Sequence, residues 1–258
     1  GFGYKEGEMI QHSINTKSIE RAQKKVEEHN FGIRKRLLEY DDVMNKQRNV
    51  VYKKRNHALF GDRLALDLDN AFYIVAEGVV NSFLEQNDYE GLRMAAIVNF
   101  GIDTAITQEE FAKGNVNELS EKLYQEATGR YQHKTGELQK QAVPVFQNIR
   151  TTQGGHIENV VVPFTDNKKG LQVLSNLNKT IETGGRELIS ALERQITLAI
   201  IDDAWKEHLR AMDDVKQSVQ TAYLEQKDPL VIYKITAFDL FRQMDSDVNK
   251  DIISFLCH

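Results

Sequence analysis

The sequence predicts a mainly α-helical protein with one long helix, an antiparallel helical hairpin, and between them a helical region that carries a small β-hairpin. Two observations support the helical part. Apolar residues recur at helical spacing over long segments, and only three prolines occur in 258 residues. A third observation, a short stretch rich in β-branched residues, predicts the β-hairpin. With 41% hydrophobic and 28% charged residues, the chain has enough apolar material for one or two cores.

The first region, residues 1–60, is predicted to be a junction followed by one long helix from Thr16 to Phe60. This segment has no proline and only Gly32 as a weak helix breaker. Its apolar residues recur mainly at steps of three, four and seven: Ile19, Ala22, Val26, Ile33, Leu37, Tyr40, Met44 and Val51. At about 1.5 Å per residue the helix would extend roughly 65 Å, so we expect it to span several neighbours.

The second region, residues 61–185, is predicted to be mainly helical. One helical face contains Leu64, Leu68, Phe72, Val75, Val79 and Phe83. The tetrapeptide TQEE, from Thr107 to Glu110, predicts a capping box, in which the Thr and Glu side chains each satisfy a backbone N–H at a helix start.

The β-hairpin is predicted within this region, near residues 145–164. Two apolar runs lie there around Gly154 and Gly155, and the second run is rich in valine. Pro144 and Pro163 flank the segment, which favours an edge position over the centre of a sheet.

The third region, residues 186–258, is predicted to form two long helices that fold back on each other. The apolar stripe of the first helix is Leu198, Ile201, Trp205, Leu209, Met212, Val215 and Val219. The stripe of the second is Val231, Ile235, Phe238, Phe241, Met244, Val248, Ile252 and Phe255. We expect the seam between the two helices to contain Trp205, Leu209, Met212, Phe238 and Phe241.

The polar stretch near residues 222–228 is predicted to be the tip of this hairpin. Asp228 followed by Pro229 is a strong helix-start signal, because Asp accepts a backbone N–H and proline at the first helical position loses no needed hydrogen bond. Tyr223 and Leu224 lie on the tip. Tyr223 either contacts a partner outside the chain or folds back onto Val219.

Charge is unevenly distributed along the chain. Between Lys17 and Arg55 there are 12 Lys or Arg and 6 Asp or Glu, a balance of +6, which leaves −11 for the rest of a chain with net charge −5. A basic helix of this kind binds an acidic partner, phosphates or anionic lipid, or else its charges bond to a neighbouring domain and to water. Because no aromatic residues alternate with the basic ones, nucleic-acid binding is disfavoured.

Motifs that would indicate catalysis are missing from the sequence. There is no glycine-rich phosphate loop, no dinucleotide-binding glycine motif, no Gly-x-Ser-x-Gly elbow and no His-Glu-x-x-His pair. Histidines are scattered, and His208 is interpreted as a surface or packing residue. The adjacent pairs Asp41-Asp42 and Asp213-Asp214 point about 100° apart on a helix, so neither pair converges on one atom. We therefore expect no catalysis, cofactor or metal site in this chain.

A single cysteine, Cys257, excludes a disulfide framework and is typical of a reducing compartment, so we expect the cytosol. The longest nearly uncharged apolar stretch, Ala71 to Leu84, is shorter than the about 20 residues that a bilayer span needs, and it contains Glu77. The start of the chain has neither a methionine nor the pattern of a signal peptide, so we expect the chain to be part of a longer protein.

Two segments resemble the C-terminal third of the SecA family, the ATP-driven motors of bacterial preprotein translocation. The first contains NF-x-IRK-x-LLEYDDV from Asn30, and the second contains W-x-x-H-L-x-A-M-D from Trp205 and Y-x-x-Q-K-D-P from Tyr223. They occur in the same order as in the family. The resemblance is specific over residues 6–56 and 188–256 and weak between them.

The resemblance implies that the three regions are the helical scaffold, the helical wing and the two-helix finger of such a motor. The finger tip, with Tyr223, Leu224, Gln226 and Lys227, would enter the SecYEG channel and contact the preprotein. Arg34, together with Lys35, would couple the scaffold to the nucleotide-binding domains.

Further partners implied by the resemblance are the preprotein-crosslinking domain of the same motor and, at the membrane, anionic lipid. ATP and Mg²⁺ would be bound by the full-length protein, which would lie in the cytoplasm and associate peripherally with the inner membrane. The alternative is a stand-alone helical adaptor or coiled-coil protein with a basic binding face, which would lack motor domains upstream.

Overall fold

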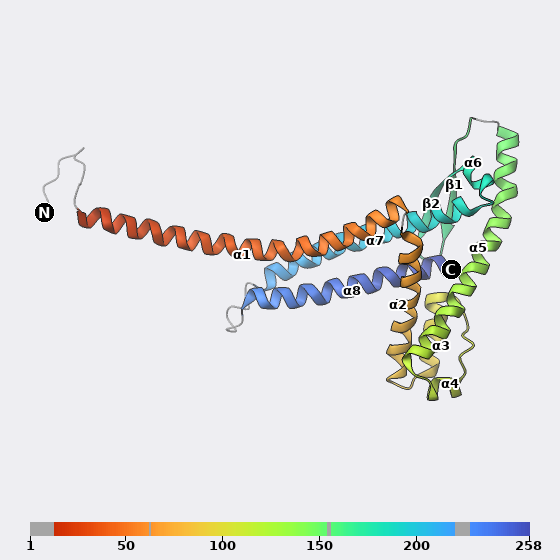
Figure 1. Ribbon diagram of the computed structural model, residues 1–258, viewed down its shortest axis with the longest axis horizontal. Coiled ribbons are helices and arrows are strands. Elements are labelled where there is room, and N and C mark those ends of the chain that lie inside the picture. Colours follow the sequence, from red (N-terminus) through yellow and green to blue (C-terminus); the bar gives the residue numbers. More distant parts are fainter. Residues whose placement is uncertain (1–12, 62, 154–155, 220–227) are drawn as a thin grey trace.

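The computed structural model describes residues 13–61, 63–153, 156–219 and 228–258, and within these ranges the protein is mainly helical, as predicted (Figure 1). The elements in chain order are α1 Ser13–Phe60, α2 Leu64–Leu84, α3 Tyr89–Phe100, α4 Gln108–Lys113, α5 Val116–Gln153, β1 Asn159–Thr165, β2 Gly170–Asn176, α6 Leu177–Glu182, α7 Arg186–Ser218 and α8 Pro229–Cys257.

Three long helices form the body of the molecule. The C-terminal half of α1 lies beside the antiparallel hairpin of α7 and α8, and its N-terminal half extends past them (Figure 1). α2 leaves the end of α1 across this body and packs with α3, α4 and the first half of α5 as a wing. The second half of α5, the two strands and α6 lie at the far end of α7.

The predicted long helix is confirmed as α1, but only its second half is packed. Gln47, Val51 and Ala58 are buried, whereas the predicted apolar stripe of the first half, including Ile19, Val26 and Leu37, is exposed. The first half of α1 therefore presents an apolar stripe that no other described part of the chain covers.

The wing has its own core of aliphatic and aromatic side chains. Phe100, Leu92 and Leu123 are fully buried in it, and Ile253 and Cys257 at the end of α8 complete it. A second core lies where the strands, α7 and α8 meet, and a third, smaller one lies near the free end of the hairpin.

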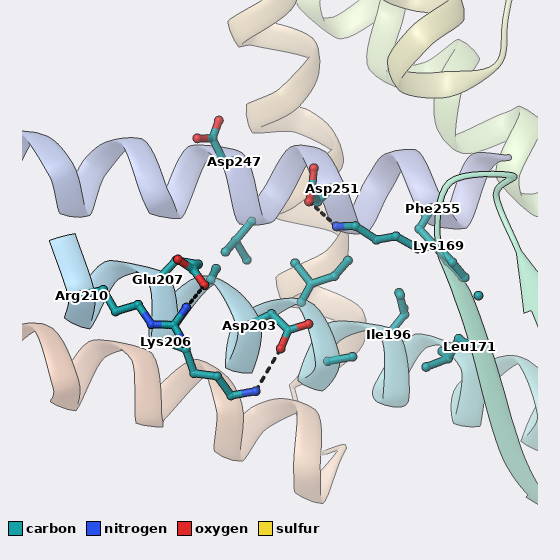
Figure 2. A pocket seen from close by; sticks show the side chains of 15 residues that line it. Lys169, Leu171, Ile196, Asp203, Lys206, Glu207, Arg210, Asp247, Asp251 and Phe255 are labelled. Carbon is teal, nitrogen blue, oxygen red and sulfur yellow. Dashed lines mark hydrogen bonds and ion pairs between the residues drawn. The ribbon is translucent and has the colours of Figure 1, made fainter.

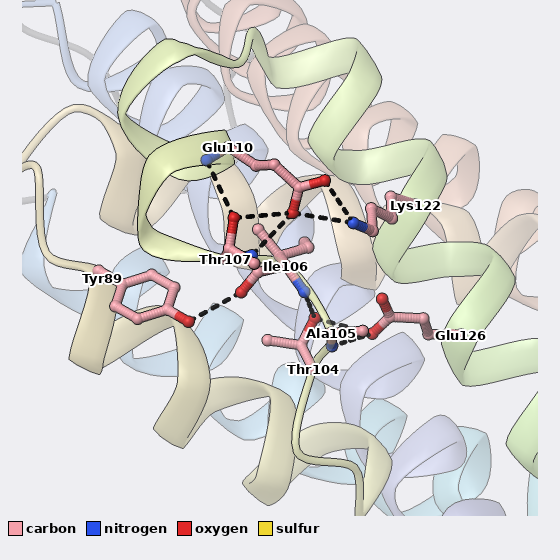
Figure 3. A network of polar contacts seen from close by, with 8 residues as sticks. All are labelled: Tyr89, Thr104, Ala105, Ile106, Thr107, Glu110, Lys122 and Glu126. Carbon is pink, nitrogen blue, oxygen red and sulfur yellow. Dashed lines mark hydrogen bonds and ion pairs between the residues drawn. The ribbon is translucent and has the colours of Figure 1, made fainter.

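Hydrogen bonds fix the loop between α3 and α4 onto α5 (Figure 3). The predicted capping box is present: Thr107 accepts from the Glu110 N–H, and the Glu110 carboxylate accepts from the Thr107 N–H. Lys122 on α5 binds Glu110 at 2.8 Å and, together with Thr107, lowers the pKa of that carboxyl to about 2. Glu126 accepts from the Thr104 hydroxyl at 2.7 Å, and the Tyr89 hydroxyl donates to the Ile106 carbonyl. The loop thus has a defined position on the wing.

The β-hairpin exists, but its predicted position near residues 145–164 is wrong. The first apolar run belongs to α5, which continues through Pro144 to Gln153. The strands are β1 and β2, paired antiparallel from Asn159 with Asn176 to Thr165 with Gly170.

Tertiary packing explains the difference. Phe146, two residues after Pro144, is buried in the second core, and this burial outweighs the hydrogen bond that proline removes from the helix. The turn is made instead by residues 166–169, where the Asp166 carboxylate accepts from the N–H groups of Lys168 and Lys169 and Asn167 has φ of 67°.

Candidate functional site

At the end of the hairpin that faces away from the wing, both helices have defined caps. Val219 caps the end of α7 and is buried, and Asp228 caps the start of α8 by accepting from the Leu230 N–H at 2.9 Å, as the Asp-Pro signal predicts. The predicted tip residues Tyr223, Leu224, Gln226 and Lys227 lie outside the described residues.

An aromatic pair binds this end of the hairpin to α1. Tyr233 on α8 is buried and meets Tyr40 on α1 edge to face, with ring centroids 4.7 Å apart. Burial raises the pKa of both phenols; Asp228 adds to the effect at Tyr40, and Asp213 and Asp41 add to it at Tyr233. Both hydroxyls therefore stay protonated at neutral pH.

A chain of hydrogen bonds links α1, α7 and α8 further along the hairpin, on the side of the aromatic pair that is nearer the wing (Figure 1). His208 on α7 binds the side-chain oxygen of Gln47 on α1 through Nε2 at 2.8 Å, and the Gln47 amide nitrogen donates to the Ala237 carbonyl on α8 at 2.8 Å. Because the glutamine oxygen only accepts, Nε2 of His208 carries the proton. Both Gln47 and His208 are buried. We call these two side chains and the Ala237 carbonyl the polar relay.

Aromatic rings fix the imidazole of the polar relay. Trp205 stacks on His208 with ring centroids 5.4 Å apart, and Phe241 meets it edge to face at 5.6 Å. Burial lowers the pKa of His208, so the ring is neutral at pH 7 and donates one hydrogen bond in one tautomer.

Ion pairs from α1 reach three different helices. Arg55 binds Asp202 on α7 at 2.9 and 3.3 Å, and Lys54 binds Asp245 on α8 at 2.5 Å. The imidazole of His57 lies 2.7 Å from the carboxylate of Asp67 on α2. Three neighbouring residues of α1 thus hold the hairpin and the wing in one arrangement.

The predicted coupling residues Arg34 and Lys35 lie on the exposed half of α1. Neither forms a hydrogen bond or ion pair with another residue of the described ranges. Their charges are therefore available to groups outside these ranges, while the basic residues near the end of α1 are used within the chain.

The predicted seam is partly wrong. Trp205 and Met212 are buried and Phe241 is half-buried, but Leu209 is 36% and Phe238 is 62% exposed. On α8 the helix face that packs near the tip contains Tyr233, Ala237 and Leu240 instead. The sequence carries two offset apolar stripes there, and the small Ala237 lets α8 approach α1 closely. The spacing of Tyr233, Ala237, Leu240 and Met244 was the signal for the correct face.

An open groove of about 670 Å³ lies between α7, α8 and the turn before β2 (Figure 2). Ion pairs line its rim: Lys169 reaches Asp251 on α8 at 2.7 Å, and Lys206 binds Asp203 on α7. Leu171, Ile196 and Phe255 form the apolar part of its lining. The groove connects the strands to both helices of the hairpin, and its three cationic side chains, Lys169, Lys206 and Arg210, each form an ion pair within the chain.

Neither a metal centre nor a membrane span is present in the parts of the chain that the structure describes. No group of three metal-ligating side chains comes together, and no helix has both the length and the hydropathy needed to cross a bilayer. What converges at the junction of α1, α7 and α8 is a set of cross-links between helices.

These features define a helical scaffold with an attached wing. The profile of the SecA Wing and Scaffold domain matches residues 9–258, and the chain belongs to this family.

Curated relatives agree with this assignment. Over 254 residues, the chain is 51% identical to "Protein translocase subunit SecA" of Christiangramia forsetii and 52% identical to the protein of the same name of Flavobacterium psychrophilum. The corresponding protein of Porphyromonas gingivalis is 43% identical. Each match covers 98% of this chain but only 23% of the relative, so the chain spans less than a quarter of their length.

Proposed function

We propose that this chain is the scaffold, wing and two-helix-finger part of a SecA-type translocation motor. In this role it couples ATP hydrolysis, carried out by nucleotide-binding domains outside the chain, to the movement of preproteins through the Sec channel. The observation that carries the proposal is the polar relay, with its neighbouring ion pairs, in a chain that belongs to the SecA wing and scaffold family.

A force applied to the exposed half of α1 reaches the hairpin because both are parts of one cross-linked body. α1 has 48 residues and therefore extends about 72 Å. Sliding α1 along α7 and α8 would leave the Gln47 amide and the His208 N–H buried without partners, and each unpaired group costs about 1–3 kcal/mol. The helices therefore move together rather than past one another.

The exposed half of α1 supports a role in receiving that force. Arg34 and Lys35 are the proposed contacts to the nucleotide-binding domains, and the uncovered apolar residues Ile19, Val26 and Phe31 suit burial against neighbouring domains of the same motor. The preprotein-crosslinking domain is the other proposed neighbour.

The proposed output is the hairpin tip. Tyr223, Leu224, Gln226 and Lys227 would contact the SecYEG channel and the preprotein, and the buried Val219 and the Asp228 cap support this by fixing the helices on either side. A tyrosine suits contact with varied peptides because its large amphipathic ring has only two side-chain torsions to restrict.

The full-length motor would bind ATP and Mg²⁺ and lie in the cytoplasm, associated peripherally with the inner membrane through the channel and anionic lipid. This chain contains no glycine-rich phosphate loop, so the residues that hold ATP would belong to the other domains. We place the scaffold at residues 1–60, the wing at 61–185 and the finger at 186–258.

The test is Tyr223→Ala in the full-length protein. We expect preprotein translocation to fall severalfold while basal ATP hydrolysis is retained, because the tip contacts cargo and takes no part in the chemistry. Tyr52→Ala, which removes an exposed tyrosine of α1, is the matched control and should change neither rate. Wild-type translocation by the Tyr223→Ala protein would remove the tip from the mechanism.

A further inference from the structure

The two-stranded sheet has two outer edges, and the edge of β2 is occupied. The Gln195 side chain on α7 donates to the Leu174 carbonyl at 2.9 Å and accepts from the Leu174 N–H at 3.1 Å. This amide therefore pairs with β2 as the backbone of a third strand would. Because β2 also packs along α7, the helix fills the space beside this edge.

The edge of β1 has no such partner among the described residues. Val161 lies directly opposite Leu174 in the ladder. Since the backbone groups of Leu174 point away from β1, those of Val161 point away from β2, because the two residues form a pair that does not exchange ladder hydrogen bonds. Neither the N–H nor the C=O of Val161 bonds any described residue, and β2 is the only described element that runs along β1. The alternation of the ladder gives Asn159, Pro163 and Thr165 the same outward direction.

The composition of β1 suits pairing with another uncharged strand. Its sequence, NVVVPFT, contains no charged residue, although proteins commonly protect a free edge with charges. Only Pro163 interrupts the row of backbone donors. Val161 is 53% exposed and its cross-strand neighbour Leu174 is 52% exposed, so a small apolar surface adjoins the edge. A row of free backbone groups beside apolar side chains is the arrangement to which extended peptides add as a further strand.

A second copy of this chain fits the edge less well than a different peptide does. If two copies of β1 paired antiparallel about Val161, Pro163 of each copy would lie opposite Asn159 of the other. Each proline lacks the N–H that the facing Asn159 carbonyl would accept from, so the pair would lose two hydrogen bonds. A peptide without proline loses only the one bond opposite Pro163. The edge therefore favours a different chain.

We propose that the free edge of β1 binds an extended, uncharged apolar segment of a preprotein as a third strand of this sheet. The identity of the bound chain rests on the proposed function, whereas the pairing rests on the geometry of the edge. Backbone groups make most of the contacts, so segments of many sequences would bind. The bound strand would be joined through β2 and Gln195 to α7, and so to the same body as the finger.

The probe is a fluorescein-labelled peptide, Thr-Val-Thr-Val-Thr-Val-Thr with blocked ends. Its binding to the full-length protein is measured by fluorescence anisotropy at nanomolar peptide, without nucleotide or channel. We expect a Kd between about 10 μM and 1 mM. The same peptide N-methylated at two adjacent central residues lacks a donor on each of its edges and should bind at least about fivefold more weakly. Because neither ATP hydrolysis nor translocation is measured, failure of this binding and failure of the proposed function are distinguishable.

The variants separate this edge from any other peptide site in the longer protein. Val161→Pro removes the outward N–H and no ladder hydrogen bond, and it should weaken binding of the peptide about fivefold or more. Val161→Thr keeps the N–H and the branched shape, so this matched control should bind within about twofold of the wild type. The methylated peptide applies the same test to the wild-type protein, so the outcome does not depend on how Val161→Pro folds.

A translocation assay tests whether preproteins use the edge. In the Val161→Pro protein the preprotein concentration that gives half the maximal rate should rise severalfold, while the maximal rate is retained. An unchanged preprotein requirement would overturn the proposal. Absence of peptide binding up to millimolar concentration, or equal affinity of the wild type and Val161→Pro for the peptide, would overturn it as well. Self-association of the wild type that Val161→Pro abolishes would assign the edge to a second copy, against the proposal.

Discussion

The wing and the junction of α1 with the hairpin are held together by different means. The wing core is apolar and its largest side chains, such as Phe100 and Phe111, are fully buried, and polar bonds fix its loop between α3 and α4 to α5. The junction places Gln47 and His208 in its interior and hydrogen-bonds them across helices. Apolar packing gives stability but tolerates sliding, whereas a buried polar relay is satisfied in only one register. The difference indicates that the wing is built for stability and the junction for a fixed alignment.

The largest effect is expected from removing apolar volume in the wing. Phe100→Ala should lower the free energy of unfolding by about 3–5 kcal/mol, because it deletes a fully buried ring and leaves a cavity. Urea unfolding of the full-length protein, followed by a probe in the wing, measures the loss. Leu66→Ala, at an exposed position of α2, should change it by less than about 0.5 kcal/mol. A similar loss in both variants would contradict the wing core described above.

An intermediate effect is expected at the junction. Gln47→Leu leaves the His208 N–H buried without a partner and should cost about 2 kcal/mol. The double variant Gln47→Leu/His208→Leu removes this unpaired group, so its loss should be smaller than the sum of the single losses. Unfolding measured on all three variants gives the coupling energy, and strict additivity would mean that the relay is not a unit.

The smallest effect concerns pH. Burial lowers the pKa of His208 in the folded protein, so below the ordinary value of 6.5 the unfolded chain binds a proton that the folded chain does not. Stability that is present above pH 6.5 should therefore be lost as the pH falls toward the lowered folded pKa. His208→Gln cannot titrate, and the difference in unfolding free energy between it and the wild type should change only below about pH 6.5. A difference independent of pH would show that the imidazole is not buried in its neutral form.

Local sequence signals predicted the helix ends well. The capping box at Thr107 and the Asp228-Pro229 start depend on residues within a few positions of one another, so the sequence contains the whole arrangement. The failures all involved tertiary contacts. Pro144 was interpreted as a boundary because its local cost is visible, whereas the burial of Phe146 that offsets this cost is not.

In the candidate site, too, local features were predicted from the sequence and tertiary contacts were not. The helices that carry the relay were predicted, but Gln47 and His208 lie 161 residues apart, and no periodicity of one sequence pairs them. His208 was interpreted as a surface or packing residue; it is a packing residue with a specific partner. α8 has two apolar stripes, one containing Phe238 and one containing Tyr233. Which of them is buried depends on which face of α8 meets α1, and this is determined by the tertiary structure.

The last turn of α8 has a consequence for the order of folding. Ile253 and Cys257 fill part of the wing core, which also contains Leu123. Because 253 − 123 = 130, at least 130 residues separate them from Leu123 in the chain. Synthesis at about 5–20 residues per second separates them by roughly 7–26 s. During that interval the emerging wing has an open apolar gap, and its native core can close only once α8 has also been made. The wing core is therefore completed after the hairpin, although most of its residues precede the hairpin in the chain.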